Sequence, residues 1–157
     1  MSMYINYQGI KGEANAKGHE DWIDVLSLDW GVSRAINSTT GTRQNREATS
    51  PNISEVTFTK LTDDSTPYLF REACTQGGKE VKIHLTKTAD NLENYLEYTL
   101  TDCIVSNYMV STDGERPIET ISLSFTKIEL RYTPHDNTGK AVSPISQIYN
   151  ISKATME

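Results

Sequence analysis

Apolar and polar residues alternate along most of this chain, as they do in strands that bury one face. Residues 55–60 and 80–85 alternate in this way on either side of a segment with helical spacing. The second of these strands places Val81, Ile83 and Leu85 on one face. Alternation with period two over four to eight residues indicates half-buried β-strands. The chain is therefore expected to be mainly β, with about six to eight strands.

One segment, at about residues 65–76, carries the signals of a short α-helix. Ser65 or Thr66 can cap its first turn, and Pro67 suits the first helical position. The apolar residues at helical spacing are expected to form one buried stripe: Leu69, Phe70, Ala73 and Cys74. A lone helix this short is unstable in water. It should therefore lie on a compact antiparallel β-barrel or sandwich.

Two long strand patterns lie at residues 22–32 and 118–132. The first has Leu28 and Trp30 on an apolar face and small or polar residues on the other. The second changes its apolar phase from odd to even positions part-way along. A slip of one residue is what a β-bulge at Thr126–Lys127 would produce. We therefore predict a bulge at that point.

A long polar stretch, at about residues 34–52, interrupts the alternation and is expected to form a long extended loop. A loop of this length without structure is unusual in a compact domain, and is more often functional or disordered than inert. Two interpretations stay open. The stretch is either a floppy surface loop or an arm that orders against a partner molecule.

Composition narrows the function. A chain of 157 residues predicts one domain, residues 1–157. The net charge of −6 argues against binding to nucleic acid. No apolar run approaches the roughly 20 residues needed to span a membrane. The first residues lack a basic stretch followed by an apolar one, so no signal peptide is expected.

Residues that carry catalytic or metal chemistry are sparse. Cys74 and Cys103 match no zinc spacing and are expected to be two reduced thiols in or near a core. His19, His84 and His135 are interpreted as far apart, and none stands in a recognisable nucleophile pattern. Acidic pairs fall at turns, and no glycine-rich phosphate loop is present. We therefore predict no enzyme activity, no metal and no cofactor.

Several segments, in order along essentially the whole chain, resemble the Hcp family, the tube protein of the bacterial type VI secretion system. Residues 22–33 resemble the family's second-strand signature, and the turn before it is also similar. That turn comprises residues 9–13. The strand-into-helix step matches at residues 56–60 with 64–69, and the last long strand with its ending matches at residues 121–125 with 132–134.

This resemblance implies a β-barrel subunit with one helix that assembles head-to-tail into a hexameric ring. Rings would stack into a hollow tube, similar to a phage tail tube, which a contractile sheath drives out of the cell. The implied partners are further copies of the chain, the spike protein, the sheath, the baseplate and effector cargo in the lumen. The protein would be assembled in the bacterial cytoplasm and then secreted without a signal peptide.

The residue pattern suggests which surfaces would serve this assembly. Ser27, Asp29 and Ser33, on the polar face of the second strand, are candidates for the inner wall, although an outer surface is an equal alternative. The long loop is expected to contact the next ring through arginines that meet acidic groups there. The candidate residues for ring stacking are Thr40, Arg43, Gln44, Arg46, Asp63 and Asp64.

A function of a different class also stays open. The chain would then be a secreted carbohydrate-binding or hydrolytic β-domain, with Trp22 as a sugar platform and the acidic turns beside it. Trp30 shares a face with Leu26 and Leu28, so core packing is the expected role for that side chain.

Overall fold

The computed structural model describes residues 1–37, 46–88 and 92–157, in which one helix and fourteen strands occur. Seven strands have six residues or more: β1 (Ser2–Tyr7), β8 (Val56–Leu61), β9 (Lys79–Thr88), β10 (Leu92–Ser111), β11 (Ile118–Ser124), β12 (Lys127–Tyr132) and β13 (Ile145–Asn150). The others are short: β2 (Ile23–Val25), β3 (Ser27–Asp29), β4 (Val32–Ser33), β5 (Ile36–Asn37), β6 (Glu47–Ala48), β7 (Asn52–Ile53) and β14 (Thr155–Met156). The prediction of a mainly β chain with one short helix is confirmed.

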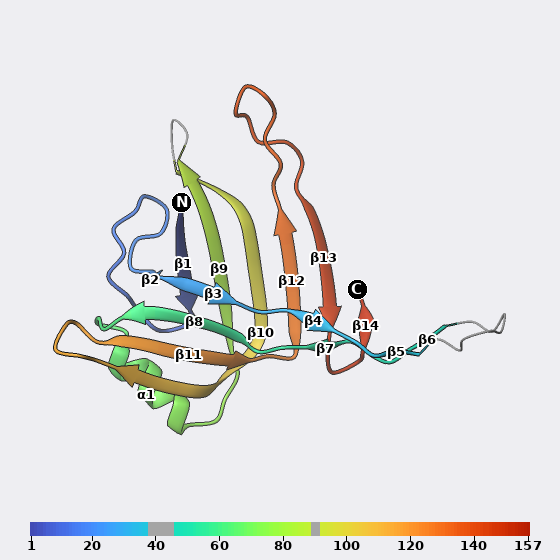
Figure 1. Ribbon diagram of the computed structural model, residues 1–157. Helices are drawn as coiled ribbons and strands as arrows, with labels where there is room; N and C mark the ends of the chain where they lie inside the picture. The colour runs from blue at the N-terminus through green and yellow to red at the C-terminus, as the bar shows by residue number, and fades with distance from the viewer. Residues whose placement is uncertain (38–45, 89–91) are drawn as a thin grey trace.

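The strands form two antiparallel layers that share β10 (Figure 1). The first half of β10 pairs with β9 and β12, and its second half pairs with β11. The first layer has the order β2-β1-β9-β10-β12-β13-β14, and the second has β3-β8-β11-β10. Asp102, with φ of 59°, lies at the irregular step in the β9–β10 pairing. The arrangement is therefore sandwich-like rather than a closed barrel.

The core lies between these layers and follows the period-two pattern of the sequence. Val81 and Ile83 are fully buried, as predicted, while Leu85 is half-buried. Further fully buried residues come from strands of both layers: Ile5, Ile23, Phe58, Leu100, Ile121 and Leu123. Because alternate side chains of each strand point to the same side, both layers present an apolar face to this core.

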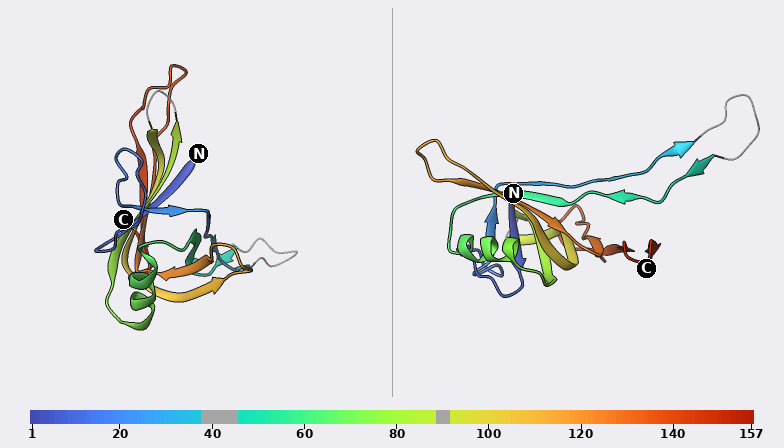
Figure 2. Two further views of the ribbon diagram at one scale, coloured as in Figure 1. Left: turned by 90° about the vertical axis from the view of Figure 1, so that its left-hand side faces the viewer. Right: turned by 90° about the horizontal axis from the view of Figure 1, so that it is seen from below.

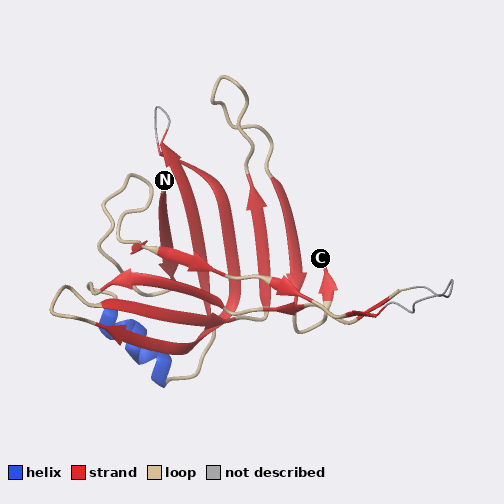
Figure 3. Cartoon of the chain, viewed as in Figure 1, coloured by secondary structure: helices blue, strands red, loops and turns tan. Residues whose placement is uncertain are grey.

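The helix α1 (Thr66–Cys74) lies against the second layer (Figure 3). Its buried residues are Leu69 and Glu72, so the predicted apolar stripe is wrong. The helix is rotated so that positions three apart face inward, and it exposes the other three members of that stripe: Phe70, Ala73 and Cys74. No helix in the described part of the chain is long and apolar enough to cross a membrane.

The two long strand patterns are interrupted where the chain changes direction. Residues 22–32 do not form one strand, because β2 belongs to the first layer and β3 to the second. Residues 118–132 do not form one strand with a bulge at Thr126–Lys127, so that prediction is wrong: the apolar phase changes where the chain passes from β11 of the second layer to β12 of the first. β11 ends at Ser124, β12 begins at Lys127, and the Thr126 amide donates to the carbonyl of Thr101 at 3.1 Å.

The described residues in and beside the polar stretch 34–52 form two antiparallel segments, residues 31–37 and 46–54, which we call the arm. Strand β4 pairs with β7, and β5 pairs with β6 further out. The described residues 31–37 and 46–50 are all exposed, and the arm extends away from both layers (Figure 2). The expected long loop therefore contains two short antiparallel ladders.

Candidate assembly surfaces

Short hydroxyl side chains cover the outer side of the second layer, opposite the buried core. We call this surface the hydroxyl face, and its aligned residues come from β3, β8 and β11: Ser27, Asp29, Thr57, Thr59, Thr120 and Ser122. Ser27 Oγ lies 2.6 Å from Thr59 Oγ1, and Thr57 Oγ1 lies 3.0 Å from Ser122 Oγ. These four hydroxyls are therefore partnered within the face, which presents mainly polar groups.

The three residues predicted to line a lumen do not lie on one surface. Ser27 and Asp29 belong to the hydroxyl face, where they lie opposite Thr59 and Thr57. Ser33 lies in the arm instead, opposite Asn52. Sequence reasoning missed the hydroxyl residues of β8 and β11, although their polar positions in alternating strands were a usable signal.

The arm is supported at its base by side chains as well as by its ladders. Ser54 Oγ accepts a hydrogen bond from the Gly31 amide at 2.8 Å, and Thr49 Oγ1 accepts one from the Ala35 amide at 3.0 Å. Of the predicted stacking residues, Arg46 is exposed next to the outer strand β6. The remaining arm candidates lie outside the described residues: Thr40, Arg43 and Gln44.

The two acidic candidates differ in their surroundings. Asp63 Oδ1 lies 2.9 Å from Lys60 Nζ and accepts a hydrogen bond from the Ser65 hydroxyl, so its carboxylate is engaged within the subunit. Asp64 is exposed. Both follow the end of β8, whereas the arm precedes its beginning, so the arm and Asp64 lie at opposite ends of this strand (Figure 1).

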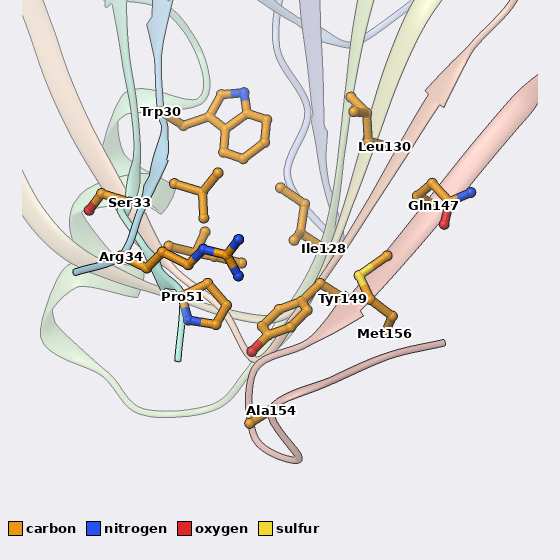
Figure 4. Close-up of a pocket in the computed structure, with 12 residues that line it drawn as sticks. Trp30, Ser33, Arg34, Pro51, Ile128, Leu130, Gln147, Tyr149, Ala154 and Met156 are labelled. Carbon is orange, nitrogen blue, oxygen red and sulfur yellow. The ribbon is translucent and has the colours of Figure 1, made fainter. Parts of the chain in front are cut away.

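An apolar groove of about 660 Å³ lies between the base of the arm and strands β12 to β14 (Figure 4). We call it the arm-base groove. Its apolar lining comes from the arm and the first layer: Trp30, Val32, Pro51, Ile53, Ile128, Leu130, Tyr149, Ala154 and Met156. The polar residues in its lining are Ser33, Arg34 and Gln147. The Arg34 side chain extends toward Pro51 over this lining.

A buried ionic network joins the helix to the second layer. Lys60 and Glu119 are both fully buried, and Lys60 Nζ lies 3.2 Å from Glu119 Oε2. Glu119 also accepts hydrogen bonds from Thr66 Oγ1 at 2.7 Å and from the Tyr108 hydroxyl at 2.8 Å. Burial, and then the bond to Glu119, raise the pKa of Tyr108. The sequence held a signal for this network, because Lys60 and Glu119 occupy core-facing positions of two paired strands.

Two of the histidines meet on the outer side of the first layer. His19 Nε2 lies 3.0 Å from His84 Nδ1, and His84 Nε2 lies 3.2 Å from Glu97 Oε1. The interpretation that the histidines are far apart is therefore wrong for this pair, because the loop that carries His19 folds back over β9. Burial, followed by His19 and Lys82, lowers the pKa of His84 to about 4.

Aromatic contacts around this pair involve Trp22, the candidate sugar platform. Its ring centroid lies 4.8 Å from that of His19 and 4.5 Å from that of His84. Trp22 is thus packed into the loop–sheet contact rather than presented as an open platform. In the described part of the chain, no group of three or more His, Cys, Asp or Glu side chains is placed to hold a metal ion.

The two cysteines are free thiols, and only one of them is in the core. Cys74 is exposed on α1 and Cys103 is buried in β10. Burial, and then the neighbouring Asp102, raise the pKa of the Cys103 thiol to about 12. Because the thiolate is the reactive form, burial and the raised pKa disfavour reaction of Cys103 near neutral pH.

Comparison with known proteins gives consistent results. A family model described as "Type VI secretion system effector, Hcp" matches residues 4–132. Protein hcp1 of Pseudomonas aeruginosa is 33% identical over 159 residues, covering 96% of this chain and 95% of that protein. A solved structure of a type six secretion system protein superposes with a TM-score of 0.91 at 24% identity, over 99% of both chains. Hcp1 from Salmonella typhimurium superposes with a TM-score of 0.80 at 22% identity, over 99% of this chain and 98% of that one.

Proposed function

The chain belongs to the Hcp family of the type VI secretion system, and we propose that its subunits form hexameric rings that stack into the hollow inner tube. It is a structural protein of that system rather than an enzyme. As a single tube-subunit domain, it would be exported with the tube, together with the spike and effector cargo. Its partners would be further copies of itself, the contractile sheath and the baseplate.

The observation that carries this proposal is that the hydroxyl face ends in two strand edges available for pairing. Within the described residues, β3 pairs with β8 alone, and residues 104–111 of β10 pair with β11 alone. The order β3-β8-β11-β10 is antiparallel throughout, so β3 and β10 run in opposite directions. Repeating the subunit around a ring would place the β10 edge of one copy beside the β3 edge of the next as an antiparallel pair.

Such pairing fits the physical requirements of a ring. A cyclic ring needs two different patches on each subunit, and the edges of β3 and β10 would supply them. Exposed edges with unpaired N–H and C=O groups otherwise promote uncontrolled association. Joined edges would give one continuous sheet with the hydroxyl face on one side. We assign that side to the lumen, with Ser27 and Asp29 on it, because partnered hydroxyls offer cargo few apolar contacts.

Ring stacking is assigned to the arm and to the opposite end of β8. The candidates Thr40, Arg43, Gln44 and Arg46 would approach an acidic group on the next ring. Asp64 is the better partner, since it is exposed whereas the Asp63 carboxylate is bonded to Lys60 and Ser65. Exposed ion pairs contribute only about 0–1 kcal/mol each, so this contact would be weak and reversible.

Electron microscopy and sedimentation of the purified protein test the ring directly. Hexameric annular particles with an open centre are expected. A monomer that persists at high concentration would refute the proposal, and glycan binding by that monomer would favour the carbohydrate-binding alternative.

A labelling experiment tests which face lines the lumen. The variant Thr57→Cys, in a Cys74→Ser background, is labelled with a biotin maleimide before rings are exposed to streptavidin. Streptavidin is too bulky to reach a biotin inside a narrow tube, so we expect binding only after the rings are dissociated. Asn137→Cys, on an exposed loop, is the control that should bind in both states. Equal streptavidin binding at Thr57→Cys in intact rings would place the hydroxyl face outside.

A further inference from the structure

The β10–β11 hairpin carries apolar side chains that the subunit does not bury. Met109, Val110 and Ile118 are 59%, 53% and 44% exposed. Met109 lies opposite Thr120 on the hydroxyl side, whereas Val110 lies opposite the core-facing Glu119. The end of this hairpin is therefore apolar on both of its faces. Single exposed apolar residues are common, but a cluster at one projecting end indicates a contact surface.

The turn of this hairpin is acidic. Asp113 and Glu115 are both exposed there. The neighbouring Arg116 is engaged within the subunit, because it donates to the carbonyl of Thr62 and lies 3.6 Å from Glu13. The hairpin tip thus combines apolar flanks with two exposed negative charges.

The arm-base groove has complementary properties. Its lining is mainly apolar, and the charged residue in that lining is the exposed Arg34. The groove and the hairpin also lie at opposite ends of the second layer. Ile118 lies opposite Leu61 at the end of β8, whereas Ile53 of the groove precedes the beginning of β8 (Figure 2).

We infer that the β10–β11 hairpin of one subunit docks into the arm-base groove of a subunit in the next ring. This inference rests on the proposed tube. Apolar burial of Met109, Val110 and Ile118 would supply the larger share of the contact, and Arg34 would meet Asp113 and Glu115. The occupant is a second copy of this chain, because the positive Arg34 of the groove complements the acidic hairpin tip. The groove and the hairpin also lie at opposite ends of the second layer, so they would meet when subunits are stacked end to end. The contact is heterologous, so it continues from ring to ring without closing on itself.

Disulfide trapping tests this contact even when stacking is transient. The variant Ser33→Cys/Ser111→Cys, in a Cys74→Ser background, places one thiol in the groove lining and one at the hairpin end. Oxidation with diamide, followed by non-reducing electrophoresis, should give a ladder of covalent multimers that extends beyond six subunits. A contact within one ring would stop at six, because the ring closes there. The matched control is Ser33→Cys/Asn137→Cys, which should give no ladder.

Charge reversal tests the predicted complementarity. Arg34→Glu in the trapping variant should slow ladder formation several-fold. Adding Asp113→Lys and Glu115→Lys should restore it, because the charges again differ in sign. Lys140→Glu, on an exposed loop away from the groove, should leave the rate unchanged.

The outcomes separate this inference from the proposed tube. If the trapping variant forms annular hexamers but no ladder, the docking contact is wrong and the ring remains supported. A ladder that stops at six, or one that the Asn137 control reproduces, also overturns the assignment between rings. If the unmodified protein forms no rings, the proposed function fails by itself. A ladder in that case would support hairpin docking in a filament that is not built of rings.

Discussion

Replacing Lys60 by Met is expected to destabilise the subunit strongly. Lys60 Nζ lies 2.9 Å from Asp63 Oδ1 and 3.2 Å from Glu119 Oε2, and it donates to the carbonyl of Leu61 at 2.9 Å. Its side chain is fully buried. Methionine retains most of the side-chain volume but leaves two carboxylates without their cation. The Glu119 carboxylate is then a buried charge with only its bonds to Thr66 and Tyr108 remaining.

The expected loss of unfolding free energy is about 3–5 kcal/mol, as is usual when one partner of a buried pair is removed. This is a large part of the roughly 5–15 kcal/mol available to a typical domain. Glu119→Gln should cost less, about 1–3 kcal/mol, because the amide still accepts hydrogen bonds and Lys60 keeps Asp63. Removing both partners in Lys60→Met/Glu119→Leu should cost less than the sum of Lys60→Met and Glu119→Leu measured separately.

Urea unfolding, followed by tryptophan fluorescence at one fixed protein concentration, measures these differences. The fixed concentration matters because self-association stabilises the folded state by mass action. The control is Lys82→Met, whose exposed Nζ lies 4.0 Å from Glu80 and whose loss should cost less than about 1 kcal/mol. If the unfolding free energy of Lys60→Met lies within 1 kcal/mol of that of the unmodified protein, the buried network does not stabilise the fold as argued.

Three further predictions follow from other contacts. Burial and nearby basic groups lower the pKa of His84 to about 4, so acidification from pH 6.5 to 4 should lower the unfolding free energy by up to about 3 kcal/mol. Between pH 6.5 and 4, His84 binds a proton in the unfolded chain but not in the folded one. His84→Gln should therefore make the unfolding free energy, measured by urea unfolding, less dependent on pH in this range. Gly78→Ala should cost about 1–3 kcal/mol in the same assay, because a Cβ there would lie 2.8 Å from the Cα of Asp102 and collide with its carboxylate. Gly31→Ala, where a Cβ would meet nothing within 4 Å, should be nearly neutral. Deleting residues 37–50 should leave rings in electron micrographs but weaken stacking, because the arm-base groove remains; tubes as long as those of the unmodified protein would exclude the deleted residues from the contact.

Strand positions and the core were predictable from the sequence because period-two alternation is local. The fully buried Val81 and Ile83 occupy the positions that the pattern indicated. The change of apolar phase near Thr126–Lys127 was also visible locally, but its cause was not: it marks the passage from β11 to β12, in different layers, rather than the predicted bulge. The division of residues 22–32 between two layers was missed, although the apolar phase changes from odd positions (Ile23, Val25) to even ones (Leu28, Trp30) across Leu26.

The helix orientation could not be read from apolar spacing alone. Apolar spacing favoured a stripe that included Phe70, yet that ring is 58% exposed and lies edge-on to Tyr108. The buried position at the next turn belongs instead to Glu72. Thr66 donates to Glu119 at the start of the helix, and this polar contact fixes how the helix lies on the layer. The local pattern shows a charge at the core-facing position of Glu119, but it does not show that Thr66 is its partner.

The candidate surfaces also divide into features visible in local sequence patterns and features that depend on distant contacts. The polar face of β3 was predictable, but its extension across β8 and β11 depends on strand register. Likewise, the meeting of His19 and His84 depends on a loop that folds back over β9. The arm was recognisable as an unusual polar stretch, while its two ladders were hidden because their residues are too few to show alternation.

The buried network also bears on how a weakly held tube keeps its geometry. It joins three segments that meet at the docking end of the subunit. Lys60 lies next to the end of β8, Thr66 begins the helix, and Tyr108 precedes the apolar end of the hairpin. A buried ion pair often contributes no more stability than apolar residues of similar volume would, so stability alone is a poor reason for one here. Its bonds have defined directions, however, and they fix the hairpin base relative to β8 and the helix. A contact made by a few apolar side chains and weak ion pairs requires such a preorganised surface, because ordering a loose hairpin on docking would consume much of the binding free energy.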